Sequence, residues 1–123
     1  MSRPLVHSVF LFLLAASTSA HALEGDDVST WSYNYGELFV LGAGTCDDYF
    51  FVNKQAAEAA QFEYSSAVFD RLGEQRAREE LLEDFENFWT GQIGPAAKAS
   101  GIEKENCESA RDHLMKFHPD VFR

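Results

Sequence analysis

Apolar residues recur every three or four positions along most of the chain after residue 28, which is the period of an amphipathic α-helix. The pattern predicts four helices, which cover about 30–41, 45–72, 74–94 and 100–118. The first segment is ambiguous, because its aromatic residues Trp31, Tyr33 and Tyr35 also alternate as they would in a strand. Four helices with short connections predict an all-α fold, either a small four-helix bundle or a compact helical array.

Helix boundaries are also visible in the sequence. Thr45 followed by Asp48 resembles a capping box with a shorter acid, and Ser100 followed by Glu103 is a capping box, so helices are expected to begin there. Glycines and a proline mark the expected ends: Gly42, Gly44 and Gly73 stop helices, and Pro95 breaks or kinks the third one.

The first 22 residues have the three parts of a signal peptide. Arg3 is basic, 9–16 is an unbroken apolar run too short to span a bilayer, and Ala20-His21-Ala22 is an A-x-A cleavage site. We therefore expect cleavage after residue 22 and a single helical domain over 23–123. That domain would be periplasmic or extracellular, without a membrane anchor.

Two cysteines, Cys46 and Cys107, follow the predicted signal peptide. An even number of cysteines in an oxidising compartment favours one disulfide over a reactive thiol or a soft-metal pair. The bond would tie the start of the second helix to the middle of the fourth.

Acidic residues outnumber basic ones by 20 to 10, which gives a formal net charge of −10, or −11 once Arg3 is removed with the leader. Phosphate backbones and anionic membranes would repel so acidic a domain. Nucleic acid is therefore excluded as the principal ligand, while a basic protein partner is favoured.

The motifs of common catalytic and metal sites are missing from the sequence. It contains no G-x-S-x-G elbow, H-E-x-x-H motif, Glu-x-x-His pair or calcium loop. His113 and His118 are five positions apart, off a common helix face, and are expected to cap a helix end or lie at the surface. The prediction is a protein without catalytic activity, metal or cofactor; a pocket around His113 with a carboxylate nearby would instead favour an enzyme.

The second predicted helix has apolar residues on two sides. Its main face is a core stripe, whereas Phe51, Phe62 and Phe69 fall together on a second stripe. Either this helix is central and another segment covers the second stripe, or the stripe is exposed and binds a partner protein or a second copy in a homodimer.

Carboxylates gather on the third predicted helix, opposite its apolar face. They are Glu79, Glu80, Glu83, Asp84 and Glu86. A solvated face explains them, and the functional alternative is a landing surface for a basic partner. The leading hypothesis is a small binding protein such as an inhibitor, an immunity-type factor or an accessory subunit. It would use Phe51, Phe62 and Phe69 with an acidic rim of Glu79, Glu83 and Glu86.

An alternative function comes from a short resemblance. The run Thr45-Cys46-Asp47-Asp48-Tyr49 resembles the start of the first disulfide-bearing helix in the small acid-activated chaperones of enteric bacteria. Those proteins share the layout of signal peptide, helical domain and two widely spaced cysteines. The resemblance implies a periplasmic acid-stress chaperone that loosens as its carboxylates are neutralised at low pH and then holds unfolded clients.

Overall fold

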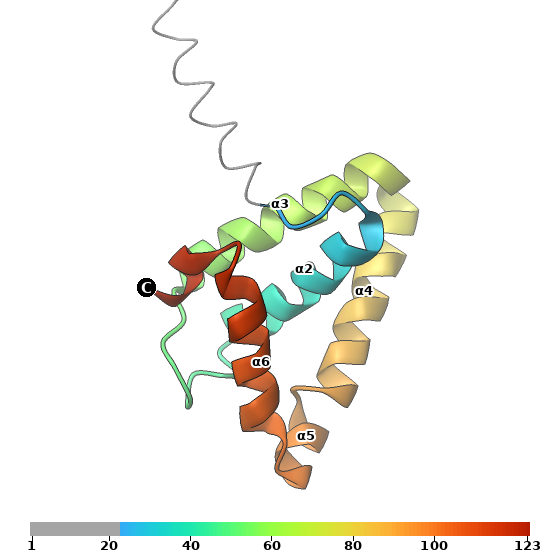
Figure 1. The fold of residues 1–123 in the computed structure, drawn as a ribbon. Coiled ribbons are helices and arrows are strands. Elements are labelled where there is room, and N and C mark those ends of the chain that lie inside the picture. Colours follow the sequence, from blue (N-terminus) through green and yellow to red (C-terminus); the bar gives the residue numbers. More distant parts are fainter. Residues whose placement is uncertain (1–22) are drawn as a thin grey trace, which may run out of the picture.

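The computed structural model describes residues 23–123, so the predicted signal peptide lies outside the described part of the chain. Six helical elements and no strand occur in this range (Figure 1). They are α2 (Val28–Gly42), α3 (Lys54–Leu72), α4 (Glu74–Gly91), α5 (Pro95–Ser100), α6 (Glu103–Met115) and the 3-10 turn η1 (Pro119–Phe122). The prediction of an all-α array with one disulfide is confirmed.

The central element is α2. It packs against both α3 and α4, which meet at Gly73 and then diverge, so that α2 lies in the angle between them (Figure 1). Its side chains Leu38, Val40 and Leu41 are completely buried. Gly36 faces α4 closely: a Cβ built there would lie 3.6 Å from the Asp84 carbonyl oxygen. Helix backbones can approach each other this closely only where the side chains between them are small. Gly36 is therefore the position at which α4 packs closely on α2.

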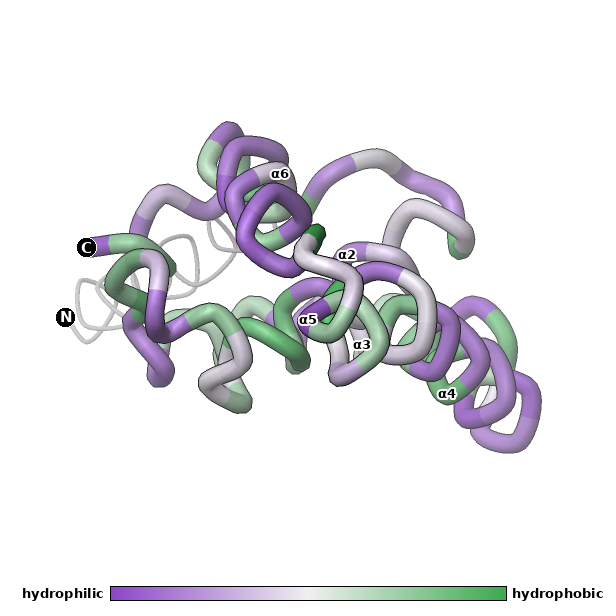
Figure 2. The backbone as a smooth tube through the Cα atoms, turned by 90° about the horizontal axis from the view of Figure 1, so that it is seen from below, coloured by the Kyte–Doolittle hydropathy of each residue, from purple (hydrophilic) through white to green (hydrophobic). Residues whose placement is uncertain are grey.

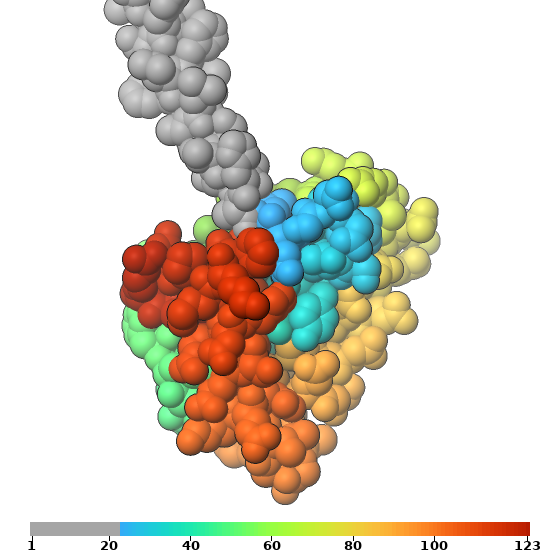
Figure 3. All heavy atoms as spheres, viewed as in Figure 1, coloured from blue at the N-terminus to red at the C-terminus, as the bar shows by residue number. Residues whose placement is uncertain are grey.

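On a third side, α2 meets α6 through long side chains. The Tyr33 and His113 rings lie 5.9 Å apart, and His113 also contacts Glu37. The space-filling view shows the atoms of α6 covering much of α2 on this face (Figure 3). Hydrophilic and hydrophobic positions alternate along the helices (Figure 2), as expected of elements that each bury one side. Among residues 23–123, no helix is both long and apolar enough to cross a bilayer.

Several predicted boundaries are correct. The ambiguous first segment is helical, and it ends at Gly42. The third helix begins at Glu74 as predicted, but it stops at Gly91, three residues before the expected end, and Pro95 opens the separate short helix α5. Proline suits that position because the first turn of a helix needs no N–H donor from it.

The predicted start of the second helix at Thr45 is wrong. Residues 43–49 form turns, and α3 begins only at Lys54, where the Asn53 side chain accepts a hydrogen bond from the Ala56 N–H at 3.1 Å. The aromatic and β-branched run 49–52 has poor helix propensity, whereas the alanine-rich segment after Asn53 has the best. Local propensity and a strong cap therefore place the boundary nine residues later.

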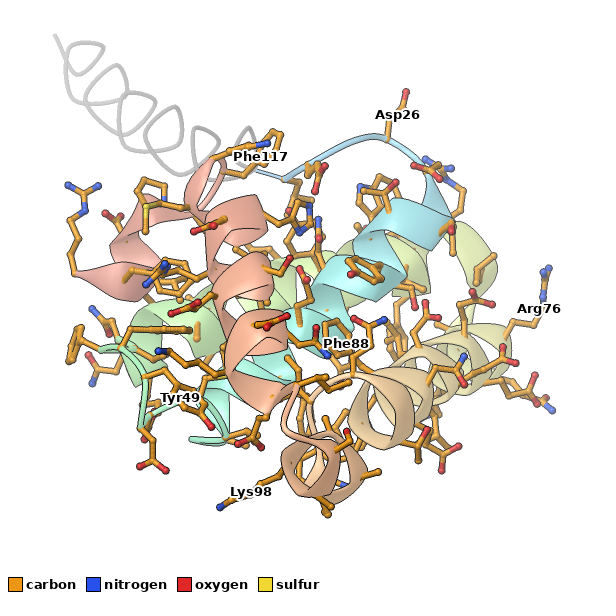
Figure 4. The ribbon with its side chains drawn as sticks, turned by 60° about the horizontal axis from the view of Figure 1, so that its bottom comes forward. Asp26, Tyr49, Arg76, Phe88, Lys98 and Phe117 are labelled. Atoms are coloured by element: carbon orange, nitrogen blue, oxygen red, sulfur yellow. A yellow bond between two sulfur atoms is a disulfide. The ribbon has the colours of Figure 1, made fainter. Side chains whose placement is uncertain are left out.

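The predicted capping box of the last helix is also wrong. Ser100 belongs to α5, where its hydroxyl donates to the Ala96 carbonyl at 3.1 Å, and Gly101 ends that helix with a positive φ of 82°. Helix α6 starts at Glu103, whose carboxylate accepts a hydrogen bond from the Tyr49 hydroxyl at 2.8 Å. Tyr49 lies beside α6 in Figure 4. A long-range partner for Glu103 thus replaces the expected local one.

The disulfide between Cys46 and Cys107 is confirmed. Both residues are fully buried, and their Cα atoms lie 5.8 Å apart. Cys46 is in the turn before α3 rather than in the helix, so the bond ties the α2–α3 connection to α6. A crosslink that spans 61 residues contributes about 4 kcal/mol to stability by restricting the unfolded chain.

Candidate functional site

The fourth side of α2 has no helix packed on it. Tyr35 and Phe39 lie one turn apart on this side, about 200° around the helix from Tyr33 and Glu37, which face α6. The other two sides are taken by α3 and α4. Tyr35 and Phe39 therefore form the floor of a groove whose walls are α3 and α4.

This groove encloses a cavity of about 580 Å³. Its lining residues come from all three helices; they are Tyr35, Phe39, Ser65, Phe69, Arg78, Leu81, Leu82 and Phe85. We call this surface the aromatic groove. The Phe39 and Phe85 rings lie 4.6 Å apart, and Tyr35 lies 5.9 Å from Phe39. Packed rings of this kind give a rigid apolar surface that a ligand can cover at low entropic cost.

The predicted phenylalanine stripe is only partly reproduced. Phe62 is 70% exposed on α3, and Phe69, two turns later, is half-buried and lines the aromatic groove. Phe51 is 64% exposed, but it precedes α3 and does not share a helix face with the other two. Placing Phe51 on that stripe was wrong, because the helix begins after it.

The α4 wall combines apolar and acidic side chains. Leu82 is 56% exposed, whereas Leu81 and Phe88 on the same helix are buried. Glu79 and Glu86 stand three residues before and four residues after Leu82, and are its neighbours on the helix surface. Glu83 is exposed, but it directly follows Leu82 and lies about 100° further around the helix, away from the groove. Of the three carboxylates predicted as an acidic rim, Glu79 and Glu86 therefore flank the groove and Glu83 does not.

Positive charge near the groove is already paired. The Arg78 guanidinium donates to the Glu74 carboxylate at 2.9 Å and lies 5.9 Å from the centre of the Phe69 ring. A second cavity of about 350 Å³ shares Phe39 with the groove and continues it along α3. Lys54 lines this extension and is bonded to Asp47 at 2.8 Å.

On the opposite side of α2, a polar cluster surrounds His113. Its Nδ1 lies 2.7 Å from Glu37 Oε1, and its Nε2 lies 2.7 Å from Glu24 Oε1. The Glu24 carboxylate also accepts from the Asn34 amide at 2.8 Å. The prediction that His113 lies at the surface or caps a helix is wrong: it joins α6 to α2 and to the segment before α2.

The two carboxylates hold His113 in its charged form. The hydrogen bond that His113 donates to Glu37 contributes most to raising the pKa of His113 to about 9. Burial raises the pKa of Glu37 from its usual value, and the nearby imidazolium opposes that shift. Burial, followed by the charge of Glu37, raises the pKa of Tyr33 to about 12. At neutral pH the cluster is an imidazolium that donates from both nitrogens beside a neutral phenol.

His118 belongs to a connected, buried chain of hydrogen bonds. The Glu24 N–H donates to the Tyr64 hydroxyl oxygen at 2.7 Å, and that hydroxyl lies 2.7 Å from His118 Nε2. Burial lowers the pKa of His118, so at neutral pH its Nε2 accepts the proton of the Tyr64 hydroxyl. The expected surface position of His118 is wrong, since only 7% of it is exposed.

Cavities of about 260 and 290 Å³ lie on either side of His113. A pocket next to a histidine and a carboxylate was the observation that would favour an enzyme. However, both ring nitrogens are occupied by carboxylates, so the imidazole offers no lone pair as a base or nucleophile. The cluster joins three segments of the chain, which are α2, α6 and the residues before α2. Within residues 23–123, no group of three His, Cys, Asp or Glu side chains is arranged to hold a metal.

Sequence reasoning missed this cluster, although α2 contained a signal. Ser32, Asn34 and Glu37 interrupt the apolar positions of a helix with little charge elsewhere, and all three are buried. Buried polar side chains need partners. Comparison with protein-family models, curated proteins and solved structures finds no match for this chain.

Proposed function

We propose that this protein is a non-catalytic binding module that engages a protein partner through the aromatic groove. The observation that carries the proposal is the open fourth side of α2, where a central helix leaves aromatic rings partly exposed between two walls. Exposed apolar surface of this kind, rimmed by polar residues, marks interaction sites in soluble proteins. Leu82 lines the groove and is exposed, and Phe62 is exposed on α3 one turn before the lining residue Ser65, so both are placed to supply outer contacts.

The polar cluster supports binding over catalysis. Its histidine bonds a carboxylate through each ring nitrogen, and removing the histidine would leave the buried Glu37 carboxylate unpaired. We therefore assign the cluster to stability and the aromatic groove to function. No metal or cofactor is part of the proposal.

We further propose that the domain acts outside the cytoplasm, in the periplasm or the extracellular space, after cleavage at residue 22. The buried disulfide is compatible with an oxidising compartment. A small acidic domain there would serve as an inhibitor, an immunity-type factor or an accessory subunit of its partner.

The experiment is crosslinking and capture with the oxidised protein in extract of the source cells, followed by titration of the captured partner. Leu82→Asp changes an exposed lining residue of the groove, and Phe62→Asp changes an exposed side chain on the same face of α3 as the lining residues Ser65 and Phe69. Neither change opens the core. Each should weaken binding at least about tenfold, since a charge replaces an apolar contact. Phe51→Asp is the matched control, because Phe51 is similarly exposed but precedes α3, and so does not share the helix face of Ser65 and Phe69 that lines the groove. Equal binding by all four proteins would refute the proposal.

A second candidate is an acid-activated chaperone, and the burial of His118 favours it. This imidazole is neutral at pH 7 and bonded to Tyr64, so acid would charge a group that the fold keeps out of water. Suppression of the aggregation of a denatured model client at pH 3 but not at pH 7 would support this function. If the protein fails to suppress aggregation at both pH values, the chaperone is rejected and the binding module stands.

A further inference from the structure

We infer that the aromatic groove receives a basic amphipathic α-helix of the partner. This inference rests on the proposed function, and it specifies the occupant of the same site. Three features of the groove support it: its shape, the lack of a backbone edge, and its charge.

The shape is that of a missing helix. Helices α3, α4 and α6 already pack around α2, and the groove occupies the remaining side. Its walls α3 and α4 meet at Gly73 and diverge from that corner (Figure 1), and the groove runs between them over the Tyr35 and Phe39 side of α2. A partner helix laid along α3 could run for about 28 Å, the length of 19 helical residues.

The groove offers a peptide no backbone to pair with. Its walls and floor are helices, and residues 23–123 contain no strand. An extended segment would press its own unpaired N–H and C=O groups against aromatic rings, which is costly. A helix satisfies those groups internally and presents only side chains, as in other helix-in-groove complexes. The occupant is therefore helical.

The negative charge at the edge of the groove favours a positively charged partner and disfavours a second copy of this chain as the occupant. Glu79 and Glu86 edge the α4 wall, and Glu58 lines the extension along α3. The two basic residues that line the groove and its extension, Arg78 and Lys54, already form ion pairs with Glu74 and Asp47. With a net charge of −10, two copies would bring like charges together at this rim. A helix with apolar residues on one face and lysine or arginine beside them complements it.

The test uses synthetic peptides of about 18 residues, long enough to follow α3. One carries Leu and Phe at i, i+3, i+4 and i+7 repeats with flanking Lys; a second has the same composition in scrambled order; a third replaces Lys by Glu. Fluorescence anisotropy measures binding to the oxidised protein, and circular dichroism of the mixtures measures helix gained by the peptide. The first peptide should bind at least about tenfold more tightly than either of the others.

Variants of the protein test whether the first peptide binds at the aromatic groove. Phe62→Asp should weaken binding of the first peptide about tenfold or more, whereas Phe51→Asp should leave it unchanged. Glu79→Gln with Glu86→Gln should weaken it several-fold and reduce its salt dependence, because these charges attract the lysines. Glu105→Gln is the matched control, since this exposed carboxylate lies on α6, across α2 from the groove.

Three results would overturn the inference. They are equal affinity for the ordered and scrambled peptides, equal affinity for the acidic peptide, and a homodimer in sedimentation that Phe62→Asp abolishes. The last outcome would make a second copy the occupant. If Phe62→Asp abolishes capture of the natural partner but no peptide binds, the helical occupant is wrong and the proposed function stands. If capture is also insensitive to Phe62→Asp, both fail.

Discussion

His113 Nδ1 donates a hydrogen bond of 2.7 Å to the carboxylate of Glu37, a residue 76 positions earlier whose side chain is only 3% exposed. The same imidazole bonds Glu24 through its other nitrogen. One charged side chain on α6 therefore fixes both the central helix and the segment that leads into it. Loss of His113 would leave a buried carboxylate without its counter-charge.

We predict that His113→Gln lowers the free energy of unfolding by about 2–3 kcal/mol. Breaking a fully buried ion pair costs more, and part of this imidazole reaches solvent. Urea unfolding at pH 7 measures the effect. Asp112→Asn is the control, because that neighbouring carboxylate is largely exposed and should change stability by less than about 0.5 kcal/mol. An equal loss in both variants would contradict the assigned role.

His113 also predicts alkaline sensitivity. Its pKa rises from 6.5 to about 9 on folding, so the folded state holds the proton more tightly than the unfolded state does. The resulting stabilisation is complete below pH 6.5 and is lost as the pH rises through 9. Unfolding midpoints from pH 6 to 10 should fall in the wild type and fall less in His113→Gln. Tyr33, with a pKa of about 12, remains neutral over this range.

The change of stability with pH has the opposite direction for His118. Its folded pKa is lowered by burial, so between that value and 6.5 the unfolded state binds more protons. Its stabilisation is present above pH 6.5 and lost as the pH falls through the folded pKa. Glu24 and His113 act on it electrostatically with opposite signs. Wild type should lose stability from pH 7 to 5 in urea titrations. His118→Asn should lose less; an unchanged slope would show that other groups control acid unfolding.

Asn53→Ala should destabilise the protein by about 1 kcal/mol, because it removes the side-chain cap of α3. It also removes a bond from the Asn53 amide to the Arg123 carbonyl at 3.2 Å. Thr45→Ala provides the comparison, since no helix begins there, and should change stability by less than about 0.5 kcal/mol. Thermal unfolding of both variants tests the corrected boundary. A larger loss of stability in Thr45→Ala than in Asn53→Ala would support the predicted helix start at Thr45 instead.

Gly36→Ala should raise stability by about 0.5–1 kcal/mol. The added Cβ would meet α4 backbone atoms at 3.6–3.7 Å, which is ordinary van der Waals contact, and alanine favours the helix more than glycine does. Gly36→Leu should instead cost about 1–3 kcal/mol by pushing α4 away. Denaturant midpoints compare the two. Destabilisation by alanine would mean that α4 sits closer to α2 than the backbone contacts indicate.

The spacing of apolar residues and the residues typical of helix ends predicted much of the fold. The helical spacing of apolar residues identified four long helices, and glycine and proline marked most of their ends, because these signals act within a few residues. The same local logic failed at Thr45 and Ser100. There, a stronger cap downstream and a partner far along the chain outweighed the nearby motif.

The sequence by itself determined the helical class, the acidic charge and the pairing of Cys46 with Cys107, since composition and local periodicity carry that information. Only the tertiary structure decided which helix is central and which side of it stays open. A helical wheel shows that a stripe is apolar but not what packs against it. The same limit hid the link between His113 and Glu37, because residues so distant in sequence become partners only when α6 packs against α2.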